Sequence, residues 1–226
     1  DGHNANPGDA EEWDFPGKVG AVSSPALRRL RTRPGAPPHT QILMDHGSGG
    51  LAAVWAEENT RDAIFAGMKH REAYATSGPR IVLRFFAGWG FSEAIINQPD
   101  PVAIVTEGGV PMGSVLRPKD KQAASPTFFV WAGADWMSAP LQRIQIIKGW
   151  IDAGGETHES VRDVICVNNL AVDPNTRRCP DNGASVDISS CEPRGYGAEQ
   201  LMVAWRDEGF DATQDAFYYI RVIQNP

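Results

Sequence analysis

The feature that most constrains this chain is a succession of short strand-like segments beyond Gly78, separated by turn residues. Several alternate apolar and polar side chains, as in the run Arg143-Ile144-Gln145-Ile146. Such alternation is typical of strands that bury one face. Segments of this kind without an intervening long helix predict an antiparallel β-sandwich. The strand-like segments cover residues 80–86, 102–106, 127–131, 143–148, 160–167, 185–189, 200–205 and 216–223.

The sequence before Gly78 has a different texture. An apolar hexamer at residues 51–56 is bounded by turn signals, which predicts a short buried strand. The clearest helix follows, since Asn59 or Thr60 can cap it and Asp62 lies in its first turn, where negative charge is favoured. We therefore expect two domains, a mixed and loop-rich one over residues 1–78 and a β-rich one over residues 79–226.

Charge and hydropathy exclude several partner classes. A net charge of −7 and a pI near 5.2 argue against nucleic acid as the main partner. No apolar run approaches the ~20 residues of a membrane-spanning helix. The first methionine is Met44, so we expect the sequence to be a piece of a longer protein whose preceding part is a partner of this one.

The cysteines Cys166, Cys179 and Cys191 fall in one stretch rich in turn residues. No Cys-x-x-Cys pair is present and no histidine lies among them, which makes a zinc site a poor fit. Their spacing favours a disulfide, with Cys179 and Cys191 as the first expected pair and Cys166 as the alternative partner for either. A disulfide predicts a periplasmic or secreted protein; reduced thiols in a cytoplasmic protein are the alternative.

One short motif can carry chemistry. Asp1-Gly2-His3-Asn4 places a carboxylate and an imidazole two positions apart, so that on an extended strand both point the same way. Such a pair suits zinc, manganese or iron. On spacing alone, an irregular chain terminus is the alternative explanation.

Two further features have competing interpretations. Glu57 and Glu58 lie between the expected strand and helix, where a carboxylate can face a site, although a solvated loop pair is the commoner explanation. The seven tryptophans, among them Trp131, Trp136 and Trp150, can form exposed platforms for sugars or protein partners. Their alternative role is packing in the core.

Several segments resemble the domain-of-unknown-function family numbered 3604. The resemblance rests on the residues around the two ends of the expected helix, 49–61 and 71–78, on Asp1-Gly2-His3-Asn4 with Pro7-Gly8, and on residues 143–150 and 216–222. The family is similar to the PHP-type metallohydrolases, whose barrels hold two or three metal ions. The resemblance implies a mixed α/β remnant of a PHP-like barrel, followed by an all-β antiparallel sandwich.

The resemblance also implies a site and an activity. It makes Asp1 and His3 metal ligands for zinc, manganese or iron. Asn4, Glu57 and Glu58 are weaker candidates for substrate binding, and we expect Glu57 and Glu58 to lie near the two ligands. The function it implies is the C-terminal portion of a metal-dependent hydrolase, acting on an unknown small molecule such as a phosphoester, with an accessory β-domain. The alternative is a non-catalytic β-module that binds a carbohydrate or a protein partner.

Overall fold

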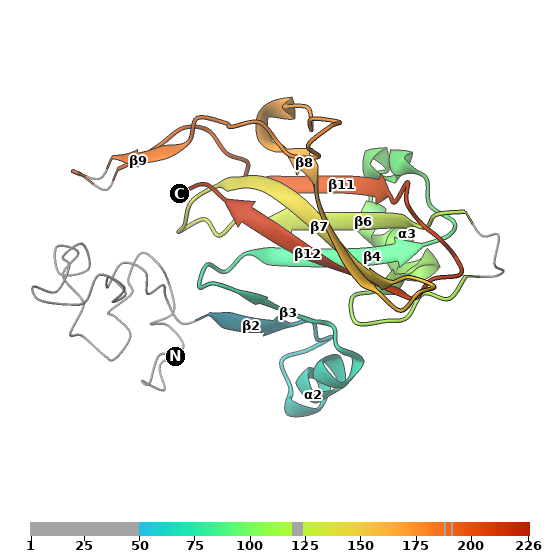
Figure 1. Cartoon of the computed structure of the whole chain (residues 1–226). Helices are drawn as coiled ribbons and strands as arrows, with labels where there is room; N and C mark the ends of the chain where they lie inside the picture. The colour runs from blue at the N-terminus through green and yellow to red at the C-terminus, as the bar shows by residue number, and fades with distance from the viewer. Residues whose placement is uncertain (1–49, 119–123, 188, 191) are drawn as a thin grey trace, which may run out of the picture. The chain divides into compact units, whose positions relative to one another are not determined.

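The computed structural model of the chain describes residues 50–118, 124–187, 189–190 and 192–226 (Figure 1). The chain divides into two compact units. The described residues of the first unit are 50–67 and 73–81, and those of the second begin with 68–72 and continue from 82 to the last residue. The domain boundary expected at Gly78 stays a prediction.

The first unit contains a two-stranded antiparallel ribbon. Strand β2 (Leu51–Val54) pairs with β3 (Ala73–Thr76), and helix α2 (Arg61–His70) lies between them in the sequence. Thr60, one of the two expected caps, accepts a hydrogen bond from the Ala63 backbone N–H at 3.3 Å. Gly67 lies so close to the carbonyl of Trp55 that any side chain there would clash. The glycine therefore lets the helix pack directly against the end of β2.

The expected fold class, a PHP-like barrel remnant followed by an all-β sandwich, is wrong. The residues that the structure describes form several small antiparallel sheets with two α-helices, and they contain no closed barrel. Parallel barrel strands are buried on both faces, whereas β2 is only partly buried and its partner β3 runs antiparallel to it. The apolar hexamer therefore supplies one strand of a two-stranded ribbon, and residues 73–76 supply the other. Residues 1–49 lie outside the described part.

The second unit contains two larger antiparallel sheets. One has four strands in the order β11 (Gln200–Arg206), β6 (Thr127–Gly133), β4 (Val82–Gly88) and β5 (Val110–Pro111). The other has the order β12 (Ala216–Gln224), β7 (Leu141–Ile151) and β8 (Thr157–Cys166). Figure 1 shows the three-stranded sheet crossing the four-stranded one. A small ribbon of β9 (Ser185–Asp187) and β10 (Glu192–Arg194) extends away from them.

One expected strand is a helix. Residues 102–106 belong to α3 (Pro101–Gly108), which is preceded by the 3-10 helix η4 (Glu93–Asn97). The Asp100 side chain accepts a hydrogen bond from the Ala103 N–H at 3.0 Å, and Pro101 occupies the first helical position. Both are strong helix-start signals. The residues that follow are apolar and β-branched, and a short run of that kind fits a strand as well as a helix. For this reason the sequence pattern favoured a strand despite the two helix-start signals.

The four-stranded sheet is covered on both faces. Phe129 and Phe128 are adjacent on β6 and point to opposite sides, and both are almost fully buried. Phe129 packs with Ile95 of η4 and Val105 of α3. Phe128 meets Tyr218 of β12, with ring centroids 4.3 Å apart. The apolar run of β6 thus serves two cores, one beneath the helices and one between the sheets.

A buried ion pair joins the two sheets. Lys148 on β7 donates to Asp207 Oδ2 at 2.6 Å and to the Gly209 carbonyl at 2.7 Å, and the Tyr218 hydroxyl donates to the same carboxylate at 2.8 Å. Burial acts to raise the pKa of Asp207, but the hydrogen bonds from Lys148 and Tyr218 outweigh it and hold that pKa below its ordinary value. Burial and the bond to Asp207 raise the pKa of the Tyr218 hydroxyl. Asp207 is therefore ionised and Tyr218 neutral at neutral pH.

We predict that Lys148→Met lowers the free energy of unfolding by about 3–5 kcal/mol, because it leaves the Asp207 carboxylate buried without a counter-charge. The double variant K148M/D207L should be more stable than K148M, since it removes the orphaned charge. Urea denaturation measures both.

The same pair predicts a pH dependence. Because its pKa is lowered in the folded protein, the Asp207 carboxylate contributes to the free energy of unfolding. This contribution is complete above the unfolded-state pKa of about 3.9 and is lost as the pH falls through the folded-state pKa. The stability difference between wild type and K148M should therefore shrink in acid. A difference that stays constant through that range would contradict the role of Asp207.

Candidate functional site

The structure describes only some of the residues predicted from the sequence to bind metal and substrate. Asp1, His3 and Asn4 lie outside the described residues, so the metal site stays a prediction. Glu57 and Glu58 are exposed, and the Glu58 carboxylate accepts a hydrogen bond from the Thr60 hydroxyl at 3.1 Å beside the start of α2. Within the described ranges, no group of three or more His, Cys, Asp or Glu side chains is arranged to hold a metal ion.

The tryptophans do not form a shared exposed surface. Of the six in the described part of the chain, Trp136 is exposed and the others are half-buried. Trp131 packs against the core beneath the helices, and Trp205 lies against Phe128 between the sheets. This pattern favours a packing role for most of them over a platform of coplanar rings.

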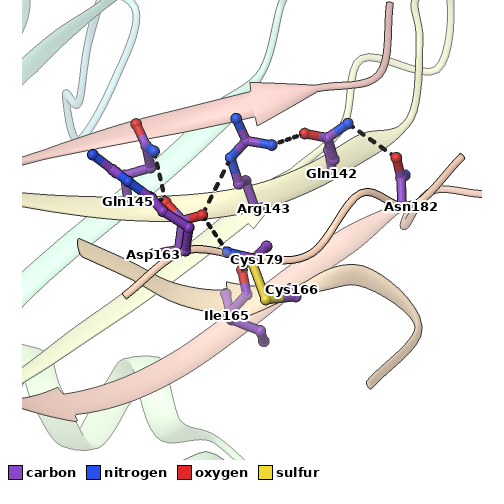
Figure 2. Close-up of a disulfide and its surroundings, with 9 residues drawn as sticks. Gln142, Arg143, Gln145, Asp163, Ile165, Cys166, Cys179 and Asn182 are labelled. Atoms are coloured by element: carbon purple, nitrogen blue, oxygen red, sulfur yellow. Dashed lines mark hydrogen bonds and ion pairs between the residues drawn. A yellow bond between two sulfur atoms is a disulfide. The ribbon is translucent and has the colours of Figure 1, made fainter. Parts of the chain in front are cut away.

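A disulfide joins Cys166, the last residue of β8, to Cys179 (Figure 2). Their Cα atoms are 5.7 Å apart and 13 positions separate them in the sequence. The first expected pair, Cys179 with Cys191, is therefore wrong, and Cys166 is the partner that had been the alternative. Cys191 lies outside the described residues. The disulfide closes a loop of turn residues onto the end of β8.

A buried carboxylate holds the same loop. Asp163 on β8 accepts hydrogen bonds from the Gln145 side-chain amide at 2.6 Å and from the Cys179 backbone N–H at 2.7 Å, and Arg143 and Arg178 each lie 3.5 Å from it (Figure 2). The Asp163 N–H donates to the Arg177 carbonyl at 3.0 Å. The loop segment before Cys179 therefore follows β8 and is bonded to it through backbone, side chain and disulfide.

The loop begins with two asparagines in the left-handed conformation. Asn168 and Asn169 have φ of 58° and 54°, and both side chains are exposed. Asparagine tolerates this conformation better than most residues, which explains why two can follow one another here. Sequence reasoning missed them, and the adjacent pair of asparagines one residue after the end of β8 was the signal that could have found them.

These asparagines border an open pocket of about 660 Å³. None of the eleven described residues that line it is charged, although 22% of the whole sequence is. Three side chains offer amide groups, and most of the others are apolar. The lining residues are Val164, Ile165, Cys166, Asn168, Asn169, Leu170, Val172, Ala198, Gln200, Leu201 and Met202.

Fold and pocket together define a β-rich protein with an uncharged cavity bordered by a disulfide. The chain belongs to the family described as "Protein of unknown function (DUF3604)", whose family model matches residues 1–226. The resemblance expected from the sequence is confirmed for this family, and its relation to the PHP-type metallohydrolases stays a prediction. No curated protein and no solved structure matches the chain significantly. Among the described helices, none has the length and apolar character needed to cross a membrane.

We predict that the double variant C166A/C179A has a free energy of unfolding about 3 kcal/mol below that of wild type, because a loop of this size is no longer closed in the unfolded chain. Urea denaturation under oxidising conditions measures the difference. Adding a reductant should bring wild type down to the level of the variant and leave the variant unchanged. Equal stability of the two oxidised proteins would refute the prediction.

Proposed function

We propose that the second unit acts as a non-catalytic binding module whose ligand is uncharged and occupies the pocket beside the disulfide. The observation that carries this proposal is the lining itself, which combines three amide side chains with an apolar surface and contains no charged side chain. Ligand sites are commonly apolar cavities of about 300–1,000 Å³ with a few polar groups that fix orientation. The pocket has that size, is open to solvent, and exposes polar and apolar surface in nearly equal amounts.

The chemistry of the lining favours one class of ligand. A charged ligand would lose water without gaining a counter-charge, which costs several kcal/mol. The amides of Asn168 and Asn169 each combine two donors with an acceptor. The Gln200 Oε1 already accepts a hydrogen bond from Trp131 Nε1 at 3.2 Å, so this amide offers its NH₂ donors. Together the three amides match neutral ligands that both donate and accept hydrogen bonds. The disulfide and the Asp163 bonds hold one wall of the pocket in place before a ligand arrives, which lowers the entropy lost on binding.

We further propose that the module accompanies a metal-dependent hydrolase activity to which Asp1 and His3 contribute ligands. The spacing of the two side chains and the resemblance to PHP-type metallohydrolases support this proposal. A carboxylate oxygen and an imidazole nitrogen suit zinc, manganese or iron. A metal ion bound there supplies an activated water and neutralises negative charge, which suits hydrolysis of a phosphoester. Asn4 is the neighbouring side chain able to donate a hydrogen bond to the substrate.

The disulfide also supports the proposed location. Disulfides persist in oxidising compartments and are rare in the cytosol. A bond between Cys166 and Cys179 that closes the wall of a binding pocket therefore fits a periplasmic or secreted protein. In such a compartment the module would meet its ligand outside the reducing cytoplasm.

The binding proposal predicts a thermal-shift result. Neutral oligosaccharides and end-blocked neutral peptides, each screened at high concentration, should include compounds that raise the Tm of wild type. Saturation at about 100 times the Kd contributes roughly 2.7 kcal/mol, which corresponds to a rise of several degrees for a chain of this size. In Val172→Glu, which adds a charge to the lining, these shifts should disappear.

Val186→Glu is the matched control. Val186 is a partly exposed apolar residue on β9 and does not line the pocket, so its variant should keep the shifts. Shifts that survive in V172E would place the ligand elsewhere. The absence of any stabilising neutral compound would reject the binding module.

The hydrolase proposal predicts a loss of metal in His3→Ala. The comparison should use the longest protein that the open reading frame encodes, with metal content measured by mass spectrometry and activity on a generic phosphodiester. His3→Ala removes one proposed ligand, so both bound metal and turnover should fall sharply. His70→Ala, which changes an exposed histidine at the end of α2, should leave both unchanged. Equal metal content in wild type and H3A would reject the assignment.

A further inference from the structure

The geometry points to an extended peptide with uncharged side chains as the ligand of this pocket, bound by pairing with the open edge of β11. This inference rests on the proposed binding module and names its ligand class. The residues of β8 and β11 that line the pocket carry the argument.

The pocket lies along strand edges. Successive side chains of a strand point to opposite faces of its sheet, so a cavity on one face is lined by every second residue. Here three consecutive residues of β11, Gln200, Leu201 and Met202, line the pocket. Three consecutive residues at the end of β8, 164–166, do the same. The cavity therefore lies beside the edges of these two strands.

From Gln200 onward, no described strand pairs with the outer edge of β11. Within the described part of the chain, β11 is the last strand of its sheet and pairs only with β6. Directly before β11, Ala198 exchanges two backbone hydrogen bonds with Leu141, at 2.8 and 2.9 Å, so the edge available to a new strand begins at Gln200. An edge strand presents backbone N–H and C=O groups that a further strand can bond. The corresponding edge of β8 is partly occupied, because the Asp163 N–H already donates to Arg177 and the disulfide lies at its end. Of the two strands, β11 is therefore the one that can accept a new partner.

The opposite wall suits the outer side of a peptide. Asn168 and Asn169 present amides, which can donate to and accept from peptide groups. Leu170 and Val172 add apolar surface next to them, where the alternating side chains of an extended segment would pack. Strand addition obtains its affinity from backbone hydrogen bonds and its selectivity from such side-chain contacts. Because the lining carries no charge, acidic and basic side chains are disfavoured at the centre of the segment.

A neutral saccharide is the competing ligand, because its hydroxyl groups also match amides. No aromatic ring is present among the described lining residues to cover an apolar sugar face. The hydroxyl groups of a saccharide are also not spaced to match the backbone N–H and C=O groups along the β11 edge. A peptide repeats its own N–H and C=O groups at the spacing of a strand.

The test is a titration of the isotope-labelled full chain followed by backbone amide resonances. The probes are acetylated and amidated pentapeptides in which threonine alternates with valine, leucine or alanine, together with analogues N-methylated at alternate backbone nitrogens. We expect at least one peptide to shift the resonances of residues 168–172 and 200–202. One of its two alternately methylated analogues should bind at least about tenfold more weakly, because it cannot donate its share of the backbone bonds.

A pair of protein variants locates the contact. Asn169→Asp preserves the shape of the side chain, and aspartate, like asparagine, tolerates a positive φ. The substitution replaces the amide donors with a carboxylate, so the affinity for the peptide should fall about five- to tenfold. Asn175→Asp is the matched control, since Asn175 is exposed in the same loop and does not line the pocket. Its affinity for the peptide should equal that of wild type.

Three outcomes would overturn the inference: no shift with any peptide, equal binding of both methylated analogues, or shifts confined to other residues. Shifts of the same resonances by maltopentaose, with none from the peptides, would replace the peptide by a saccharide and leave the binding module intact. The thermal-shift comparison with V172E decides the binding module itself, so the two proposals fail separately.

Discussion

The bond between Lys148 and Asp207 is the contact on which the arrangement of the second unit depends. It connects β7, the central strand of one sheet, to the residue that directly follows β11 in the other. Both side chains are buried, so neither can turn to water if the other moves. Replacing such a pair with apolar residues can be neutral, but removing one partner is costly. The pair therefore specifies one position of the two sheets more than it adds stability.

Strand β7 carries a second buried polar side chain, Gln145, three residues before Lys148. Gln145 is buried and donates to Asp163 on β8, and this carboxylate in turn receives the Cys179 N–H. One strand thus fixes the partner sheet through Lys148 and the disulfide loop through Gln145. That loop forms one wall of the pocket. The contacts of β7 that fix the sheets therefore also fix the shape of the proposed binding site.

Much of the strand content could be predicted from the sequence because it depends on local alternation. Seven of the eight expected segments beyond Gly78 overlap observed strands, and residues 102–106 are the exception. That miss reflects the weak distinction between a short apolar strand and a short apolar helix, which Asp100 and Pro101 decided. The barrel remnant was wrong for a different reason. Strand partners are set by contacts distant in the sequence, and no local pattern showed that β2 pairs with β3.

The pocket was beyond prediction because it depends on two strand edges and a loop that meet only in the folded unit. The cysteine stretch indicated a disulfide, but spacing alone could not choose between Cys166 and Cys191 as the partner of Cys179. Uncharged pocket residues also leave little trace in a sequence, because Leu201, Met202 and Val172 are indistinguishable from core residues until their neighbours are known. Asn168 and Asn169 were the one visible signal, and their meaning came from their backbone conformation.

The position of Asp207 in the chain also affects how the second unit folds. Lys148 and Asp207 are 59 residues apart, so a long segment of chain separates the lysine from its counter-charge. Strands β7 and β8 pair directly, and we expect a hairpin formed by them alone to keep the Lys148 ammonium group in water, which opposes its packing on the other sheet. Domains usually fold as units, and contacts between distant segments form slowly. We therefore expect closure of the two sheets to be a late event in folding, once the segment that carries Asp207 has joined them.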